Sequence, residues 1–246
     1  MSERTTTQPE SEESTDSRDP KHSNTGTEPD STPTQVTSGA TSTVRALENA
    51  GIDVMFGVQG GAIMPVYDAL WDSDLRHVMM AHEQGAAHAA DAYNVVSGQP
   101  GVCLATSGPG ATNLVTGLAD ANMDSDAVVA LTGQVPQHMV GSDAFQETDT
   151  TGITAPITKN NYFASDPDTV GDTVGEAVAL ASSGRPGPTL VGLPKDVTNG
   201  ETEREPSMPQ TPETYTPQNE ADEAAVAEAA RVIEAAEKPL LLFGGG

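Results

Sequence analysis

Short apolar runs alternate with longer segments of helical spacing between residues 39 and 197. The runs predict buried strands, and apolar positions repeating every three to four residues predict helices. Strands that are apolar throughout and alternate with helices are typical of a parallel sheet covered on both faces. We therefore predict an α/β fold, a parallel sheet flanked by helices. Helices are expected at 41–50, 63–70, 84–96, 111–123 and 168–181, and strands at 54–58, 78–80, 102–105, 127–131 and 189–191.

Two segments differ from this pattern. Residues 1–38 are rich in Ser, Thr, Pro, Asp and Glu, so they cannot bury enough apolar surface to offset the ordering entropy. We predict a disordered acidic tail at 1–38, a sheet domain at 39–197 and a linker of similar composition at 198–219. Residues 220–246 predict a helix to 237 and a strand entering a Gly-rich turn. We expect them to be the start of a central α/β domain that is truncated, since they are too few for a core.

The chain is strongly acidic, with a formal net charge of −25. Acids outnumber bases by 8 to 3 in residues 1–39, by 18 to 5 in 40–196 and by 10 to 3 in 197–246. This charge argues against binding to nucleic acid or to an anionic membrane surface. Its spread along the chain predicts a halophilic surface, on which salt screens the self-repulsion. An ordinary acidic cytosolic protein is the alternative.

Cys103 is the only cysteine, which excludes an internal disulfide and fits a reducing compartment. It lies in an apolar strand and is interpreted as a core residue. No apolar run has the length of a membrane span, and residues 1–38 lack the apolar region of a signal peptide. We expect a soluble, cytoplasmic protein.

Two loops follow predicted strands and precede predicted helices. In Gly57–Ala62, the adjacent Gly60 and Gly61 would let the backbone approach a ligand closely. Ser107–Asn113 has the same placement, and amides at a helix N-terminus favour anions. Either loop could instead be a structural turn, and Ser107–Asn113 lacks both common phosphate-binding glycine patterns.

Glu83 stands between a short apolar strand and an Ala-rich helix. A carboxylate is costly to bury there unless something pairs with it. It could serve a reaction that needs a proton handed to a ring nitrogen, or it could merely complement the helix dipole. His82 and His88 flank it without a third ligand in metal spacing, so we predict no metal site.

Bases are scarce in the sheet domain, so each one is a candidate. Lys159, Arg185 and Lys195 lie in loops near predicted strand ends, where α/β proteins bind ligands. A salt bridge is the alternative role for each. Phe145 and Gln146 follow a Gly-Ser-Asp loop.

Six segments carry the most specific patterns of the chain: Gly60–Asp68, His82–Ala90, Gly101–Asp120, Thr132–Pro136, Asp143–Glu147 and Ser183–Pro188. In this order they resemble the N-terminal part of the acetolactate synthase (acetohydroxyacid synthase) catalytic subunit, a thiamine diphosphate enzyme. The resemblance implies a pyrimidine-binding domain at 39–197. It also implies that Glu83 hydrogen-bonds the aminopyrimidine ring of the cofactor, which favours the tautomer that activates the thiazolium carbon. An apolar setting would keep Glu83 protonated enough for this task.

The same resemblance implies a reaction and further site residues. Pyruvate would be decarboxylated and joined to a second 2-oxo acid, pyruvate or 2-oxobutyrate, in branched-chain amino acid biosynthesis. Gly60 and Gly61 would contact the cofactor, and Phe145 would line the substrate channel. Gln146 and Lys195 would be catalytic residues in the same channel. Magnesium would be bound through a C-terminal domain supplied by the partner subunit of a homo-oligomer, with a regulatory small subunit as a further partner. Arg185 matches a residue that contacts FAD, which the family binds without using it for redox.

The sequence departs from the family pattern at two places. Gln59 replaces a usual Pro, and Asn94–Val96 replaces Ala-Arg-Ala. With the expected truncation, we predict that the chain is inactive alone. Another thiamine diphosphate-dependent 2-oxo acid decarboxylase or carboligase, such as glyoxylate carboligase, is an alternative. A non-catalytic fragment that pairs with an intact subunit is a third interpretation.

Overall fold

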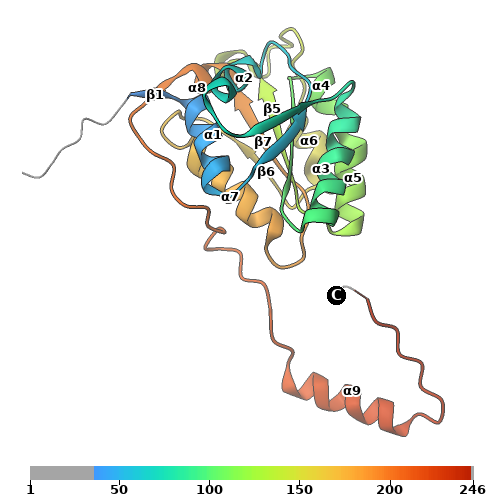
Figure 1. Cartoon of the computed structure of the whole chain (residues 1–246). Helices are drawn as coiled ribbons and strands as arrows, with labels where there is room; N and C mark the ends of the chain where they lie inside the picture. The colour runs from blue at the N-terminus through green and yellow to red at the C-terminus, as the bar shows by residue number, and fades with distance from the viewer. Residues whose placement is uncertain (1–35, 245–246) are drawn as a thin grey trace, which may run out of the picture. The chain divides into compact units, whose positions relative to one another are not determined.

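A computed structural model describes residues 36–244 and contains a six-stranded sheet in the order β3-β2-β4-β5-β7-β6 (Figure 1). All neighbouring strands of this sheet are parallel. The predicted parallel sheet is therefore confirmed. The strands are β2 (Val54–Gly57), β3 (Arg76–Met79), β4 (Gly101–Ala105), β5 (Val128–Gln134), β6 (Asn160–Phe163) and β7 (Thr189–Pro194).

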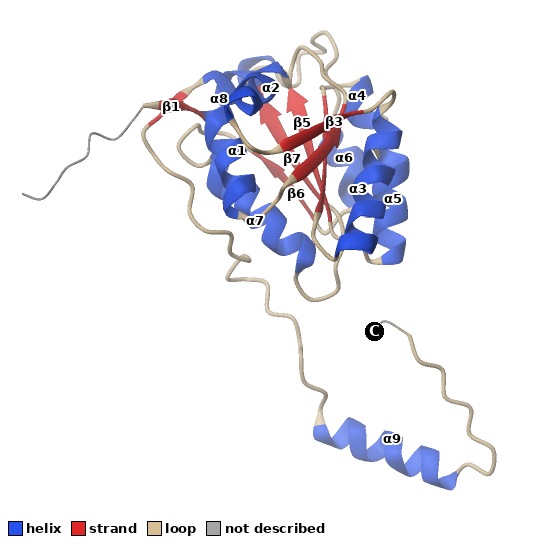
Figure 2. Ribbon diagram, in the orientation of Figure 1, coloured by secondary structure: helices blue, strands red, loops and turns tan. Residues whose placement is uncertain are grey.

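Helices cover both faces of the sheet (Figure 2). The longer ones are α1 (Gly39–Asn49), α3 (Glu83–Ser97), α5 (Val115–Asp124) and α7 (Val170–Ser182). Shorter turns are α2 (Met64–Ala69), α4 (Pro109–Thr112), α6 (Thr150–Thr154), α8 (Lys195–Asn199) and the 3₁₀ helices η1 (Leu70–Asp72), η2 (Gln137–Met139) and η3 (Ala155–Ile157).

Strand β4 shows why the central strands are apolar throughout. Val102 and Leu104 belong to the core cluster that includes α1 and α7, whereas Cys103 and Ala105 belong to the cluster formed with α3 and α5. Successive side chains of a strand point to opposite faces, and here both faces are buried. Cys103 is fully buried, as predicted, and burial raises the pKa of its thiol to about 12.

Several local features differ from the sequence prediction. The helix expected at 111–123 is divided into α4 and α5, with Asn113 as the C-cap of α4. Strand β6 was missed because half of its sequence Asn-Asn-Tyr-Phe is polar; it is an edge strand that pairs only with β7. Helix α8, which crosses the predicted boundary between the sheet domain and the linker, was missed as well.

The ends of the predicted sheet domain pair with each other. Strand β1 (Thr37–Ser38) runs antiparallel to β8 (Glu201–Thr202). The prediction of disorder to residue 38 was therefore wrong for these two residues, and residues 1–35 lie outside the described part of the chain. Part of the predicted linker packs on α7, because Arg204 pairs with Asp172 at 3.0 Å and the Tyr215 hydroxyl donates to the Ser183 carbonyl.

Helix α9 (Glu223–Ala235) forms within the helix predicted to end at residue 237. The strand predicted after Lys238 is absent through Gly244, where the described residues end. Leu240 and Leu242 are 94% and 97% exposed. An isolated segment gains no ladder hydrogen bonds, so apolar composition alone does not produce a strand. Within residues 36–244, no helix combines the length and apolarity needed to cross a bilayer.

Candidate functional site

The carboxyl edge of the parallel sheet brings most of the predicted site residues to one end of the domain. Gly60 and Gly61 follow β2, Glu83 follows β3 and Lys195 follows β7. The long segment after β5 carries Phe145 and Gln146 there as well. Loops at the carboxyl ends of parallel strands are the usual ligand sites of α/β folds.

Glu83 is the first residue of α3 and is partly buried. The preceding His82 is the N-cap, and its Nδ1 accepts from the Gln84 amide at 3.1 Å. The Glu83 Oε2 atom accepts a hydrogen bond of 2.9 Å from the side-chain amide of Asn113. Its Oε1 atom lies beside Gly110, where an added Cβ would be 3.4 Å away. The carboxyl group is thus bound on one oxygen and bordered by a side-chain-free residue at the other.

The two adjacent glycines have different surroundings. An added Cβ at Gly60 would lie 2.4 Å from the Cβ of Thr106, and Thr106 Oγ1 accepts from the Ala62 amide at 3.2 Å. Gly60 therefore lets two loops of the site approach each other. Gly61 is exposed, and nothing lies within 4 Å of a Cβ built there. Only Gly61 leaves open space for a ligand to contact backbone.

Tyr67 and His77 form a pair near Glu83 that sequence reasoning missed. The Tyr67 hydroxyl and His77 Nε2 are 3.0 Å apart, and the rings pack edge to face. Burial, followed by the negative charge of Glu83, raises the pKa of Tyr67. Burial also lowers the pKa of His77. Both side chains therefore favour their neutral forms, and Tyr67 is the one that feels the Glu83 charge.

The loop after β5 presents Phe145 and is fixed by Glu147. Phe145 is 86% exposed. The Glu147 carboxylate accepts hydrogen bonds from the backbone amides of Gly141 and Ala144, which lower its pKa. Gln146 has a positive φ of 57°, and its carbonyl lies against Gly108. This contact joins the loop to the turn that carries Asn113.

Arg185 and Lys159 lie at the amino ends of β7 and β6, so the structure separates them from Glu83. Arg185 donates to Ser125 Oγ at 2.8 Å and to the Asn122 carbonyl at 3.1 Å. Lys159 donates to the carbonyls of Leu180 and Ser183. Of the three candidate bases, only Lys195 lies at the edge where α/β ligand sites form.

His88 has acidic neighbours that its spacing in the sequence did not reveal. Ligand atoms of His88, Asp91 and Asp120 all lie within 4.8 Å of one another, and His88 Nδ1 is 3.5 Å from Asp120 Oδ2. Asp120 belongs to α5, so this group forms only when α3 and α5 pack together. His88 and Asp91 lie on α3, the helix that begins with Glu83, but the group shares no residue with the hydrogen bond between Glu83 and Asn113.

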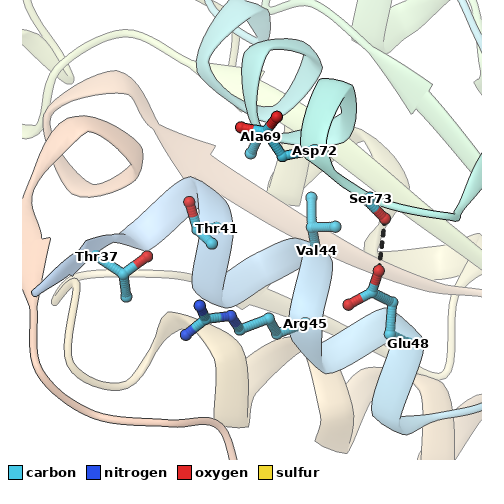
Figure 3. Close-up of a pocket in the computed structure, with 8 residues that line it drawn as sticks. All are labelled: Thr37, Thr41, Val44, Arg45, Glu48, Ala69, Asp72 and Ser73. Carbon is cyan, nitrogen blue, oxygen red and sulfur yellow. Dashed lines mark hydrogen bonds between the residues drawn. The ribbon is translucent and has the colours of Figure 1, made fainter. Parts of the chain in front are cut away.

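A cavity of about 340 Å³ lies between α1 and the α2–η1 segment (Figure 3). Figure 3 shows Ser73 donating to Glu48, at an oxygen–oxygen distance of 2.5 Å. Arg45, which also borders the cavity, pairs with Glu205. None of the predicted site residues lines this cavity, so it is separate from the site at the carboxyl edge.

Residues 37–153 match the family described as thiamine pyrophosphate enzyme, N-terminal TPP binding domain. The acetolactate synthase large subunit of Mycobacterium tuberculosis is 53% identical over 214 residues, which are 86% of this chain and 34% of that protein. The probable acetolactate synthase large subunit of Methanocaldococcus jannaschii is 48% identical over 212 residues, 85% of this chain and 36% of that protein.

The corresponding protein of Corynebacterium glutamicum is 50% identical over 210 residues, 85% of this chain and 33% of that protein. The chain thus spans about a third of the length of the curated relatives it matches. Gly60, Gly61, Glu83, Phe145 and Gln146 lie within the matched residues 37–153, whereas Lys195 lies beyond them. The chain is therefore a homologue of acetolactate synthase large subunits over about a third of their length, and residues 37–153 match the N-terminal TPP binding domain of thiamine pyrophosphate enzymes.

Proposed function

We propose that the chain supplies the pyrimidine-binding side of a thiamine diphosphate-dependent acetolactate synthase. The observation that carries the proposal is the Glu83 carboxyl, held on Oε2 by Asn113 and bordered at Oε1 by Gly110. When bound, the cofactor acts as the electron sink for the decarboxylation of a 2-oxo acid. The role of Glu83 is to exchange a proton with a ring nitrogen of the cofactor from a fixed position.

The surrounding residues fit an aromatic heterocycle. The open backbone at Gly61 admits a flat ring without a side-chain clash, and Gly60 keeps this backbone close to Thr106. Exposed Phe145 offers an apolar wall from the loop after β5. Gln146 is placed beside it by the contact of its carbonyl with Gly108. These features support Gly60, Gly61 and Phe145 as channel residues and Gln146 as a catalytic residue.

The proposed substrates are pyruvate and a second 2-oxo acid, pyruvate or 2-oxobutyrate. Lys195, partly buried at the end of β7, carries the positive charge that a substrate carboxylate needs. Products would be carbon dioxide and 2-acetolactate or 2-aceto-2-hydroxybutyrate, in branched-chain amino acid biosynthesis. The single buried Cys fits reaction in the cytoplasm.

The remaining cofactors and partners are proposed from the resemblance. Magnesium and the diphosphate would be bound by a domain that the relatives have in the two thirds of their length not matched by this chain. That domain would come from the partner subunit of a homo-oligomer. A regulatory subunit would be a further partner. FAD would meet Arg185, but Nε and Nη2 of its guanidinium already donate to the end of α5. A flavin phosphate would therefore have to accept its hydrogen bonds mainly from Nη1 of Arg185.

The test joins the full chain to the remaining two thirds of the Mycobacterium tuberculosis large subunit and measures acetolactate from pyruvate. We expect turnover from the chimera and none from the chain alone with thiamine diphosphate and Mg²⁺. Glu83→Gln should lower kcat by about 100-fold or more, since positioned acid–base groups contribute on this scale. Glu48→Gln, on α1, should leave kcat unchanged.

The outcomes separate the proposals. Undiminished carboligation by the Glu83→Gln chimera would refute the proposed role of this residue. Aldehyde as the main product would favour a decarboxylase. Robust turnover by the chain alone would refute the need for a further domain.

The acidic surface leads to a second measurement. We propose that the chain is adapted to high salt, because its net charge of −25 creates self-repulsion that counterions screen. Its melting temperature should rise steadily between 0.1 and about 2 M KCl. A melting temperature independent of KCl would contradict halophilic adaptation.

A further inference from the structure

Asn113 contacts Glu83 from a turn that the fold holds in one conformation. Its side-chain nitrogen is 2.9 Å from Glu83 Oε2. Its backbone amide donates to the Pro109 carbonyl at 3.1 Å. Gly108, which precedes α4, has φ 58° and ψ −117°, a combination available to glycine and costly for other residues. The position of the Asn113 amide is therefore set by backbone geometry and does not depend on a long flexible side chain.

The chemistry of an amide restricts the two carboxyl oxygens differently. The side-chain NH₂ of Asn donates and cannot accept, so Glu83 Oε2 must be an acceptor in this contact. A protonated carboxyl has one acceptor carbonyl oxygen and one hydroxyl oxygen. The carbonyl oxygen is the stronger acceptor of the two, so a donor held at Oε2 favours the acid form that carries its hydroxyl on Oε1.

The surroundings of Oε1 complete the arrangement. Gly110 is buried and lies beside Oε1, and a Cβ there would be 2.8 Å from Thr106 Cγ2 and 3.4 Å from Oε1. A side chain at residue 110 would crowd both groups. The absence of one leaves Oε1 as the oxygen free to meet a ligand atom.

We propose that Asn113 is a positioning residue that directs the acid proton of Glu83 to Oε1. The inference deepens the proposed function and rests on it for its catalytic consequence. The acid form with the proton on Oε1 is thereby favoured over the form that would point its hydroxyl at the Asn113 NH₂ group, and Glu83 donates its proton from the oxygen that faces the ligand. The geometric part concerns this chain alone and can be tested without the cofactor.

The first experiment observes the Asn113 side-chain amide by NMR in the full chain without cofactor. We expect its ¹H resonances to be displaced from ordinary Asn values and to return toward them in Glu83→Ala. Asn94 is the matched control, because its amide donates to the Gln99 carbonyl at 2.9 Å and should be unaffected. Asn113 side-chain ¹H shifts that have ordinary values and do not change in Glu83→Ala would overturn the proposal.

The second experiment uses the chimera and measures hydrogen–deuterium exchange at the thiazolium C2 of saturating thiamine diphosphate. Asn113→Leu keeps the size but loses the donor, and should slow exchange by about 10-fold or more with a smaller change in the cofactor KM. Asn94→Leu removes comparable hydrogen bonds far along α3 and should leave the exchange rate unchanged.

Asn113→Asp separates positioning from a structural role. Near neutral pH the introduced carboxylate repels that of Glu83 and donates nothing, so exchange should be slow. As the pH falls and the introduced carboxylate takes a proton, its hydroxyl can donate to Oε2, and the rate should recover relative to wild type. A rate in Asn113→Leu equal to wild type, or no recovery of Asn113→Asp at low pH, would overturn the positioning role. An exchange rate in the Glu83→Gln chimera equal to wild type would instead refute the proposed function. The NMR result would still test the hydrogen bond between Asn113 and Glu83.

Discussion

Gly108 lies against the backbone carbonyl of Gln146: a Cβ built on Gly108 would be 2.5 Å from that oxygen. The contact connects the turn before α4 with the loop after β5, two segments that are far apart in the chain. Both residues have positive φ, 58° at Gly108 and 57° at Gln146. This contact therefore fixes Gln146, the residue after Phe145, against the turn that carries Asn113.

Gly108→Ala should therefore cost more than an ordinary glycine replacement. The new methyl group would collide with a backbone atom, and the backbone conformation would be strained as well. We expect a loss of about 3 kcal/mol in the free energy of unfolding, measured by urea denaturation. Gly98→Ala is the control, because φ is also positive there (73°) but nothing lies within 4 Å of its Cβ. A loss no larger than in the control, about 1 kcal/mol, would contradict the contact.

Gly117 and Gly85 should respond to alanine in opposite directions. A Cβ at Gly117 would be 2.5 Å from the Cβ of Ala87, where α5 crosses α3 closely. Gly117→Ala should lower the free energy of unfolding by about 1–3 kcal/mol through overpacking. A Cβ at Gly85 would meet only the end of Met80 at 3.6 Å, so Gly85→Ala should raise it by about 0.5–1 kcal/mol. If chemical denaturation gave changes of the same sign for the two variants, the close packing of α5 on α3 at Gly117 would be contradicted.

Asp91 should make stability fall as the pH rises. Burial is the largest cause that raises its pKa to about 6, followed by Asp126 and Asp120, while His88 acts in the opposite direction. The folded state therefore retains a proton that the unfolded state loses near pH 3.8, and between these two values stability declines. Above about pH 6 the whole penalty is present.

Asp91→Asn should remove this penalty. Because the group is only partly buried, we expect a gain of about 1 kcal/mol at pH 8 after allowance for solvent screening. The gain should vanish near pH 4, as followed by thermal melting across the range. Asp124→Asn on α5 deletes an exposed carboxylate and controls for the change in net charge. An equal gain in both variants would mean that global charge, and not the Asp91 site, is responsible.

Glu147 should determine the order of the loop that presents Phe145. Its carboxylate binds the amides of Gly141 and Ala144, and these bonds lower its pKa. The stabilisation is therefore present above the unfolded pKa and is lost as the pH falls through the lower folded value. Glu147→Gln should reduce the hydrogen-exchange protection of these two amides several-fold at neutral pH, because charge-assisted bonds are stronger than neutral ones. Glu203→Gln is the exposed control, and unchanged protection in Glu147→Gln would refute the loop role.

The sequence alone predicted the central strands of the sheet but not the edge strand β6. Fully buried strands have apolar residues on both faces, so β4 and β5 stand out as continuous runs whatever their neighbours are. Strand β6 also pairs with a parallel neighbour, but half of its residues are asparagine. Its pairing with β7 identifies it as a strand, and its sequence does not. The apolar run after Lys238 shows the converse, since without a partner it stays irregular through Gly244.

The candidate site divides in the same way. Glu83 could be selected from its position between a strand and a helix, and the family could be recognised from local motifs, because both depend on residues close together in the chain. Asn113, thirty positions away, could not be assigned to Glu83, and Arg185 could not be assigned to the opposite edge from Lys195. Local pattern determines which segments become strands and helices, because burial and backbone geometry act over a few residues. The tertiary structure alone decided which side chains meet, because contacts across the sheet depend on strand order, which no single segment encodes.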